Sequence, residues 1–304
     1  MTHFENVAVF MGGWSAEREV SLMSGTAVTA ALERLEIPTT AVDVNRNICS
    51  EIQQQSYSHV FNVLHGRGGE DGVIQGLLDV LGIPYTGSGV LGSALAMDKL
   101  RCKKLWQGIG LPTPEYRLLN SEEDCTEAIE LLGLPLMIKP VLEGSSIGIS
   151  KVSSDDEMMP SWRDAKACGG PVIAEQYIDG EEYTAAILND RVLPMVRLKT
   201  NNEFYDYQAK YISDKTEFYC PCGLSESVEA ELAVMMMKSF RAVMGENWGR
   251  VDFMMDSEQK PWLIEVNTVP GMTDHSLVPM AAKQAGISFD ELVLQILQGA
   301  SLHG

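Results

Sequence analysis

The chain has few basic residues for its length. Its 304 residues include 23 lysines and arginines against 42 aspartates and glutamates, which gives a formal net charge of −19 at pH 7. A field of that sign repels polyanions, so the composition excludes nucleic acid and anionic membrane surfaces as general partners. Any phosphate site in this chain must therefore be basic locally.

Close-spaced cysteines and long apolar runs are also lacking. Of six cysteines only Cys220 and Cys222 stand close together, and no second pair or histidine lies nearby in the sequence. This spacing argues against zinc and is typical of reduced thiols in a cytosolic protein. No uninterrupted apolar stretch reaches the roughly 20 residues of a membrane span, and the N-terminus has no basic leader. We therefore expect a soluble cytoplasmic protein.

The first part of the chain alternates between strands and helices. An apolar strand at residues 7–11 precedes a helical pattern over 15–35, and a strand at 60–64 precedes a glycine-rich loop and a helix over 73–81. Such alternation is typical of an α/β protein with a parallel sheet, whose ligands gather at the carboxyl ends of the strands. The length allows two or three such units.

The later segments are less regular. A helical stretch with four basic residues runs from residue 91 to 110, and a domain boundary is expected near residue 96. Strands follow at residues 136–139 and 172–176, and a methionine-rich helix over 227–244 is expected to be core.

Two strand-like segments on either side of a turn at residues 256–260 predict a hairpin. A turn centred between Glu258 and Gln259 pairs Asp252 with Glu265 and Arg250 with Asn267. Side chains alternate along a strand, so these four point to one face. The other face would carry Val251, Phe253, Ile264 and Val266 as core.

Like charges directly opposite each other destabilise a hairpin, so the pairing of Asp252 with Glu265 needs a reason. A divalent cation supplies one, because a hard ion prefers carboxylate and amide oxygens gathered at one point. A solvated charged face is the alternative.

Lys139 ends an apolar strand, where an unpartnered ammonium would be costly to bury and a bound phosphate would compensate it. A lysine extending from the strand end into solvent is the alternative. The loop from Glu143 to Gly148 offers backbone N–H groups and two hydroxyls for an anion, although such a loop is often only a turn.

These pieces occur in one order along the chain: Gly-Gly-Trp-Ser-Ala-Glu17, His65-Gly-Arg-Gly-Gly-Glu-Asp-Gly72, Met97-Asp-Lys99, Lys139-Pro, Glu143-Gly-Ser-Ser, Phe204 to Tyr211, Arg250-Val-Asp252, Glu265-Val-Asn267-Thr-Val-Pro-Gly271 and His275-Ser276. In this combination the chain resembles the D-alanine–D-alanine ligases of the ATP-grasp superfamily, over about residues 7–298.

The resemblance implies an ATP-grasp fold of three α/β domains, over residues 1–96, 97–180 and 181–304, with the nucleotide between the central and C-terminal domains. It implies ATP-dependent ligation of two D-alanine molecules through a D-alanyl phosphate, with release of ADP and phosphate. That activity belongs to peptidoglycan precursor synthesis, and hence to cell wall biogenesis and cell shape. The family also suggests a homodimer.

The resemblance assigns roles to individual residues. The nucleotide would contact Lys99, Lys139, Glu175, Gln176, Glu182 and Lys210. Two magnesium ions, which Mn²⁺ can replace, would bind Asp252, Glu265 and Asn267. Gln176 stands where the family often has lysine, which puts a charged contact to adenine in doubt.

On the substrate side, Glu17 would receive the ammonium of the first D-alanine and Ser276 the carboxylate of the second, with His65 beside them. Arg250 and the backbone of Gly271 would stabilise charge at the reacting centre. Ser145 and Tyr211 would orient the first substrate together with Glu17.

Amide formation in water needs an activated carboxylate, and phosphoryl transfer from ATP supplies it. The polar stretch over residues 200–216 is the expected lid that excludes water from the acyl phosphate. Two alternatives stay open: a ligase of other specificity, such as one forming a D-alanyl-D-lactate ester, and a nucleotide-binding regulatory protein on an inactive scaffold. Lys210 and Tyr211 resemble the dipeptide-forming type, and the retained charged residues favour an enzyme.

Overall fold

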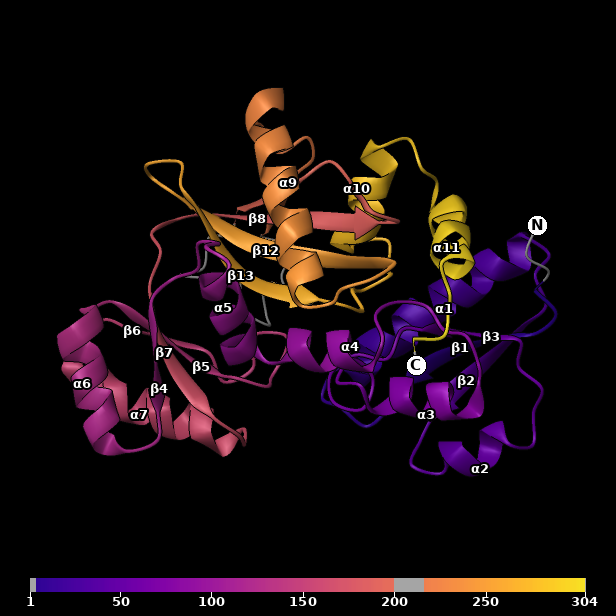
Figure 1. Ribbon diagram of the computed structural model, residues 1–304, viewed down its shortest axis with the longest axis horizontal. Helices are drawn as coiled ribbons and strands as arrows, with labels where there is room; N and C mark the ends of the chain where they lie inside the picture. The colour runs from indigo at the N-terminus through magenta and orange to yellow at the C-terminus, as the bar shows by residue number, and fades with distance from the viewer. Residues whose placement is uncertain (1–3, 200–215, 304) are drawn as a thin grey trace.

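The computed structural model describes residues 4–199 and 216–303, whose strands form three sheets. Figure 1 shows these sheets as three bodies, each with its own helices. The predicted lid, apart from Thr216, lies outside the described residues, and so do Lys210 and Tyr211.

The first sheet has the order β2-β1-β3 and is parallel, as the alternation of strands and helices predicts. Its strands are β1 (Val7–Gly12), β2 (Thr39–Val44) and β3 (His59–Asn62). Its helices are α1 (Arg18–Arg34), α2 (Ile48–Ile52) and α3 (Val73–Leu81). Alternate residues of β1 enter two separate cores, one on each face of the sheet. Strand β2 was not predicted.

The second sheet has the order β4-β7-β5-β6 and is antiparallel. Its strands are β4 (Tyr116–Leu119), β5 (Leu136–Pro140), β6 (Ser150–Val152) and β7 (Val172–Gln176). Helices α6 (Glu122–Leu132) and α7 (Asp155–Ala167) cover one face with an apolar core. The other face carries Lys139 and Glu175 beside a small apolar cluster that contains Ile173.

The third sheet is also antiparallel, in the order β11-β10-β8-β12-β13, with β9 paired to β8. Its strands are β8 (Gly180–Leu188), β9 (Arg191–Val192), β10 (Val196–Lys199), β11 (Glu217–Tyr219), β12 (Trp248–Asp256) and β13 (Pro261–Asn267). Helix α9 (Glu226–Ala242) packs on it, and Met236 is fully buried there, so the methionine run is core as predicted.

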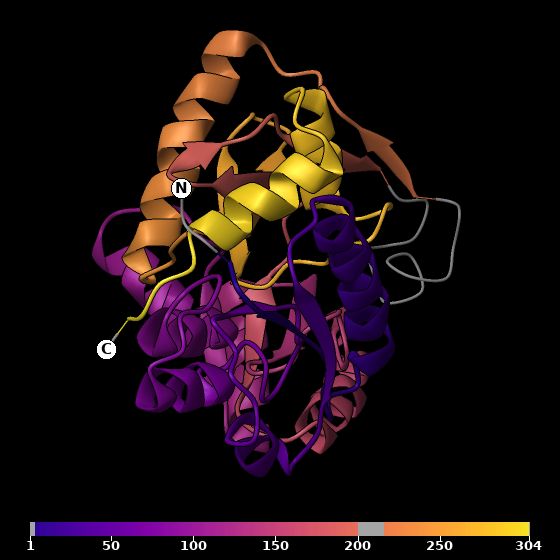
Figure 2. The same cartoon turned by 90° about the vertical axis from the view of Figure 1, so that its right-hand side faces the viewer.

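The last two helices connect the third sheet to the first. They are α10 (Leu277–Gln284) and α11 (Phe289–Gln298). Figure 2 shows α11 beside α1, and the ion pair of Arg34 with Asp290, 2.5 Å between Nη2 and Oδ1, joins the two helices. One apolar core is continuous from β1 through α11 to β8.

The single helical stretch predicted over residues 91–110 is wrong, because the structure has two helices there. Helix α4 (Val90–Met97) ends at Asp98, where the backbone is extended. Asp98 is also the N-cap of α5 (Lys99–Gly108), and its side chain accepts the Arg101 N–H. An aspartate in this role is a good helix N-cap, and the break redirects the chain. Trp106 on α5 is buried in the core of the third sheet. The residue limits of the three domains remain predictions.

The predicted hairpin is confirmed: β12 pairs with β13, Asp252 faces Glu265 and Arg250 faces Asn267. The register then shifts, so that Phe253 faces Leu263, and Leu263 is fully buried while Ile264 is half-buried. The placement of Ile264 in the core is therefore wrong, because a β-bulge adds one residue to β13.

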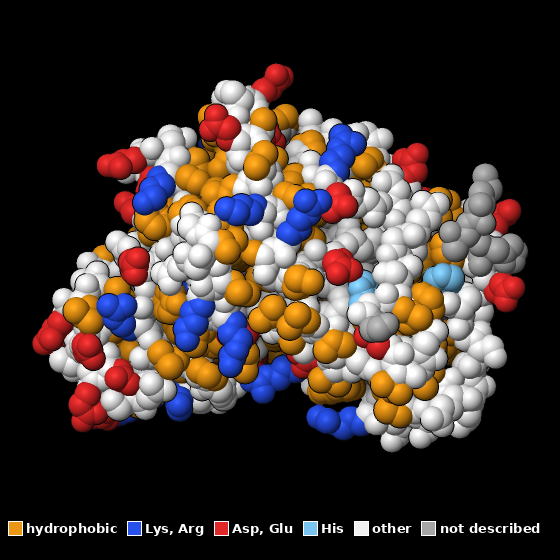
Figure 3. All heavy atoms as spheres, viewed as in Figure 1, with side chains coloured by type: hydrophobic (Ala, Val, Ile, Leu, Met, Phe, Trp, Pro, Cys, Tyr) orange, Lys and Arg blue, Asp and Glu red, His pale blue; other side chains and the backbone are white. Residues whose placement is uncertain are grey.

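The charged side chains are dispersed over the face of the molecule that Figure 3 draws. Figure 3 shows acidic and basic side chains spread over one face, without a continuous basic surface. In the described ranges, no helix is both long and apolar enough to cross a bilayer.

Candidate functional site

One cavity gathers most of the predicted site residues. It opens where the loops after β1 and β3, the loop after β5 and the hairpin face of the third sheet meet. The predicted residues that line it are Glu17, His65, Lys99, Ser145, Arg250, Glu265, Asn267, Gly271 and Ser276. Lys139, Glu175, Gln176, Glu182 and Asp252 lie outside its lining.

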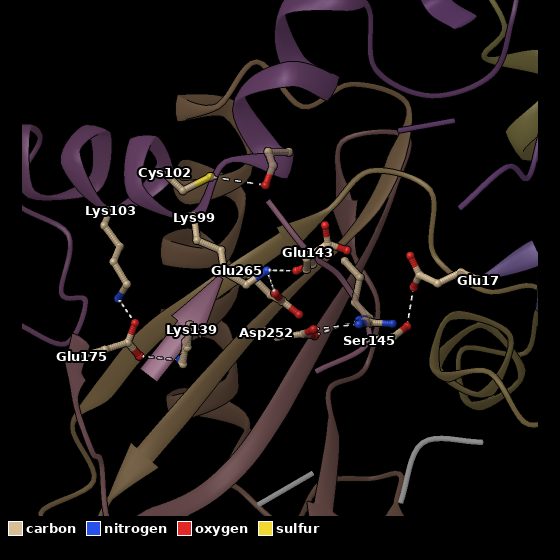
Figure 4. Close-up of polar contacts among 12 residues, drawn as sticks. Glu17, Lys99, Cys102, Lys103, Lys139, Glu143, Ser145, Glu175, Asp252 and Glu265 are labelled. Carbon is tan, nitrogen blue, oxygen red and sulfur yellow. Dashed lines mark hydrogen bonds and ion pairs between the residues drawn. The ribbon is translucent and has the colours of Figure 1, made fainter. Parts of the chain in front are cut away.

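Glu17 stands at the N-cap position of α1 and is only 9% exposed. The hydroxyl of Ser145 donates to its Oε1, which joins the loop after β5 to the first sheet (Figure 4). Within the described ranges Glu17 makes no ion pair with a lysine or arginine, so a neutral hydroxyl is its closest partner there. A carboxylate held this way is suited to a cationic ligand group.

Two glycines make room for this carboxylate. A Cβ on Gly66 would lie 2.7 Å from Glu17 Oε2, and one on Gly144 would lie 3.0 Å from the same atom. The backbones of Ser145 and Ser146 have φ of 50° and 60°, which non-glycine residues rarely adopt. Strained backbone of this kind is found at functional loops.

Two further contacts hold the same loop. Arg67 Nη2 lies 2.6 Å from Glu143 Oε1, and Lys99 Nζ donates to the Glu143 carbonyl oxygen at 2.7 Å. The sequence does not predict the ion pair of Arg67 with Glu143, because the two residues are 76 positions apart and no local pattern joins them.

On the hairpin, each carboxylate has its own cation. Arg250 Nε and Nη2 lie 2.8 and 2.7 Å from the two oxygens of Asp252, and Lys99 Nζ lies 3.0 Å from Glu265 Oε2. Burial acts to lower the pKa of Lys99, but attraction to Glu265 outweighs it, and the pKa stands above its ordinary value. From the sequence, repulsion between Asp252 and Glu265 was the reason to expect a metal ion. The structure corrects that reason, because a cation of the chain already compensates each acid.

The donor chemistry of the hairpin still fits a hard cation. Asp252, Glu265 and Asn267 share one face and offer only carboxylate and amide oxygens, which suit Mg²⁺. Thr184 on the neighbouring strand donates to Asp252 Oδ1 at 2.5 Å and fixes that carboxylate. In the part of the chain that the structure describes, no three histidine, cysteine, aspartate or glutamate side chains are grouped so that they could hold a metal ion, and the hairpin offers two carboxylates with one amide.

His65 is buried beside the cavity and remains neutral. Burial lowers its pKa to about 4. The charge of Arg250 also lowers the pKa, while a hydrogen bond with the Val269 backbone acts to raise it. Its Nε2 lies 3.5 Å from Ser24 Oγ, which in turn accepts the Met272 N–H at 3.0 Å. His65 thus connects the first sheet to the segment before α10.

The segment before α10 also places Gly271 and Ser276. Ser276 is the N-cap residue of α10, and its hydroxyl accepts the Thr273 N–H at 3.0 Å. A Cβ on Gly271 would lie 2.9 Å from Ser276 Oγ, so a side chain at this position would displace that hydroxyl. A helix N-terminus with a hydroxyl at the cavity wall is suited to a carboxylate.

Outside the cavity lining, Glu175 lies between two lysines. Its oxygens are each 2.7 Å from an ammonium, Oε1 from Lys139 and Oε2 from Lys103 (Figure 4). Burial acts to raise the pKa of Glu175, but the two cations outweigh it and the pKa lies below its ordinary value. This side chain, predicted to contact the nucleotide, is thus engaged by the protein itself.

Comparison with known proteins agrees with this geometry. Two family profiles match the chain, one described as the D-ala D-ala ligase N-terminus over residues 43–88 and one as the D-ala D-ala ligase C-terminus over residues 105–298. A D-alanine–D-alanine ligase of Nitrosococcus oceani is 53% identical over 291 residues, which cover 96% of this chain and 92% of that protein. The chain belongs to the D-alanine–D-alanine ligase family.

Solved structures of the family share the fold. The D-alanine–D-alanine ligase from Bacillus anthracis superposes with a TM-score of 0.87 at 33% identity and covers 97% of both chains. The same enzyme complexed with ATP gives 0.86 at 31% identity, over 97% of both chains. The VanG D-Ala:D-Ser ligase from Enterococcus faecalis gives 0.86 at 29% identity, over 97% of this chain and 99% of that one. The ATP-grasp prediction is confirmed.

Within this family fold, the cross-strand registers extend the hairpin face to β8. Glu182 faces Met254, Thr184 faces Asp252 and Ala186 faces Arg250. Glu182 therefore shares the face of the predicted metal residues, while Gln176 is exposed at the end of β7. The roles given to these two residues remain predictions.

Sequence reasoning did not single out two buried charged residues, Glu70 and Lys103. Glu70 lines the cavity, accepts the Gly66 N–H at 2.8 Å, and has a pKa raised well above its ordinary value by burial and by the charge of Glu17. Lys103 is fully buried, and burial lowers its pKa to about 8 against the attraction of Glu175. Lys103 follows Lys99 by four residues and therefore lies on the same face of α5. This spacing is the signal in the sequence that could have identified Lys103.

Proposed function

We propose that this chain joins two D-alanine molecules, with ATP as the energy source, through a D-alanyl phosphate. The observation that carries the proposal is the buried Glu17 carboxylate in one cavity with Lys99, Arg250 and Glu265. An ammonium site and a phosphate site on opposite sides of one cavity suit a zwitterion whose carboxylate is to be phosphorylated.

The residues around Glu17 hold the amino acids. Glu17, oriented by Ser145, binds the ammonium of the first D-alanine and places its carboxylate toward Arg250. Ser276 and the N-terminus of α10 bind the carboxylate of the second D-alanine. His65, neutral at physiological pH, adds no charge to this part of the cavity.

The residues of the second and third sheets hold the nucleotide. Lys99 and Lys139 pair with the phosphates, and Glu182 binds the ribose. Gln176 and the backbone near Glu175 contact the adenine. Asp252, Glu265 and Asn267 would hold two Mg²⁺ or Mn²⁺ ions, which would neutralise phosphate charge and align the transferred group. Arg250 and the Gly271 N–H stabilise charge that develops during the transfer.

The reaction uses the substrate's own groups. A carboxylate oxygen of the first D-alanine attacks the γ-phosphorus of ATP and ADP leaves. The amine of the second D-alanine then attacks the acyl carbon, loses a proton, and phosphate leaves with that carboxylate oxygen. The protein contributes position and charge, as is general for phosphoryl transfer.

The wider assignment rests on the same proposal. The product serves cell wall synthesis, which places the enzyme in the cytoplasm, and the family suggests a homodimer. The domain limits at residues 96 and 180 and the lid over 200–216 with Lys210 and Tyr211 belong to this proposal.

Phosphate release from Mg-ATP, measured with a panel of amino and hydroxy acids, tests the proposal. We expect release that requires D-alanine and yields D-alanyl-D-alanine in equal amount. D-serine and D-lactate, offered together with D-alanine, test the specificity for the second substrate. Equal stimulation by L-alanine, or ATP turnover without dipeptide, would reject the assignment.

A further inference from the structure

Lys103 is a fully buried cation that lines no part of the cavity. Its Nζ lies 2.7 Å from Glu175 Oε2 and donates to Thr113 Oγ1 at 2.7 Å. An ammonium without water requires such partners, because burial of a charge costs several kcal/mol. An apolar side chain of similar size could fill the position without that cost, so packing alone does not explain the lysine.

Lys103 and Lys139 share one carboxylate. Glu175 on β7 reaches Lys139 on β5 through Oε1 and Lys103 on α5 through Oε2. Figure 4 shows the carboxylate between the two ammonium groups, which approach it from different elements. Lys139 and Lys103 therefore share the single negative charge of Glu175.

The same lysine is tied to the third sheet. Thr113, which accepts from Lys103, donates to the Leu263 carbonyl oxygen at 2.9 Å, and the Leu263 N–H bonds to Pro112 O at 2.9 Å. Leu263 stands two residues before Glu265 on β13. The chain of contacts thus runs from Lys139 through Glu175 and Lys103 to the strand of the proposed metal ligands.

We propose that Lys103 is a positioning residue for nucleotide binding. By holding one oxygen of Glu175 it weakens the hold of that carboxylate on Lys139 and leaves the Lys139 ammonium available to nucleotide phosphates. This role rests on the function proposed above. Without Lys103, the buried Glu175 would keep Lys139 as its only counter-ion among the described residues and compete directly with the phosphates.

Calorimetric titration with Mg²⁺ and a non-hydrolysable ATP analogue tests this role without turnover. We expect Lys103→Met to weaken analogue binding about tenfold and Lys103→Arg to restore most of the loss, an effect in the usual range for charges in contact. The matched control Lys104→Met alters the exposed neighbour on α5 and should bind as wild type does. The KM for D-alanine should stay unchanged in Lys103→Met.

The double variant separates positioning from packing. Glu175→Gln removes the competing charge, and its own affinity for the analogue is the reference for the double variant. Lys103→Met in that background should then cost less than about twofold. If Lys103→Met does not fold, Lys103→Gln, which keeps hydrogen-bond donors for Thr113 and Glu175 without the charge, tests the same role.

Two results would overturn the role of Lys103: unchanged analogue binding in Lys103→Met, or losses that simply add in the double variant. A wild-type protein that does not bind the analogue would overturn the proposed function itself. The two failures are therefore distinguishable.

Discussion

The two sides of the cavity treat their carboxylates differently. On the hairpin side, Asp252 and Glu265 each have a cation of the chain, Arg250 and Lys99, within 3.0 Å. On the side of the first sheet, Glu17 has the Ser145 hydroxyl and the space left by two glycines.

This difference indicates which charges belong to the folded protein and which await a ligand. The hairpin acids are compensated before any nucleotide arrives, so they contribute to the stability of the fold as well as to a site. Under the proposed function the charge of Glu17 is matched by a ligand, so its loss should affect binding more than folding. The predictions below test this contrast, from the largest expected effect to the smallest.

Glu265→Gln should show the double role of the hairpin side. We expect the ligation rate to fall about 100-fold or more, because a carboxylate contact to the proposed cation is lost. The ligand-free protein should also lose about 1–2 kcal/mol of unfolding free energy, because the largely buried Lys99 loses its counter-ion. Steady-state kinetics and urea unfolding measure the two effects.

Glu258→Gln, in the exposed turn of the same hairpin, is the control and should change neither quantity. Normal turnover in Glu265→Gln would remove that residue from the site. Undiminished stability would show that the pair with Lys99 contributes nothing to the fold.

His65 should make the stability pH-dependent. Its folded pKa of about 4 lies below the ordinary value of 6.5, so only the unfolded chain gains a proton as the pH falls between them. Stability is therefore full above pH 6.5 and should decrease by about 3 kcal/mol as the pH falls to 4. Denaturant titrations of wild type and His65→Gln across this window should give a smaller decrease in the variant; equal decreases would contradict the assignment.

Glu17→Gln should affect the substrate but not the fold. An amide can still accept from Ser145 but carries no charge for an ammonium, so kcat/KM for D-alanine should fall about 30-fold, near 2 kcal/mol. Analogue binding and unfolding free energy should stay at wild-type values, as they should in the exposed control Glu19→Gln. A large loss of stability would place Glu17 with the hairpin acids and remove the contrast.

Gly144→Ala should have the smallest effect of the four. The added Cβ would lie 3.0 Å from Glu17 Oε2, and the loop must yield slightly, so we expect an increase of about fivefold in the KM for D-alanine. Gly108→Ala on α5 is the matched control, since its Cβ meets nothing within 4 Å, and it should raise stability by up to about 1 kcal/mol. An unchanged KM in Gly144→Ala would mean that the Glu17 carboxylate is not tightly held.

The parts of the fold that follow local periodicity were predictable. Alternation along β12 and β13 placed Asp252 opposite Glu265, and the pattern of residues 73–81 gave α3 with the correct limits. The bulge places Leu263 in a core built from distant elements, among them α4 and α5, which contact β13, and no local pattern encodes it.

The ion pairs were not predictable in the same way. The pair of Arg67 with Glu143 joins loops from different sheets, and the pair of Lys103 with Glu175 joins a helix to a strand. Because such contacts form only when separate units pack together, the sequence showed Glu265 on the hairpin without Lys99, the cation that compensates it.

Transfer of a labelled oxygen tests the central claim of an acyl phosphate most directly. D-alanine labelled with ¹⁸O in its carboxylate should deliver one labelled oxygen to each phosphate released, because the attacking carboxylate oxygen leaves with the phosphorus. The dipeptide should then retain one labelled oxygen at its new amide. Mass spectrometry of phosphate and dipeptide from one reaction measures both, and phosphate without label, formed together with D-alanyl-D-alanine, would contradict the account.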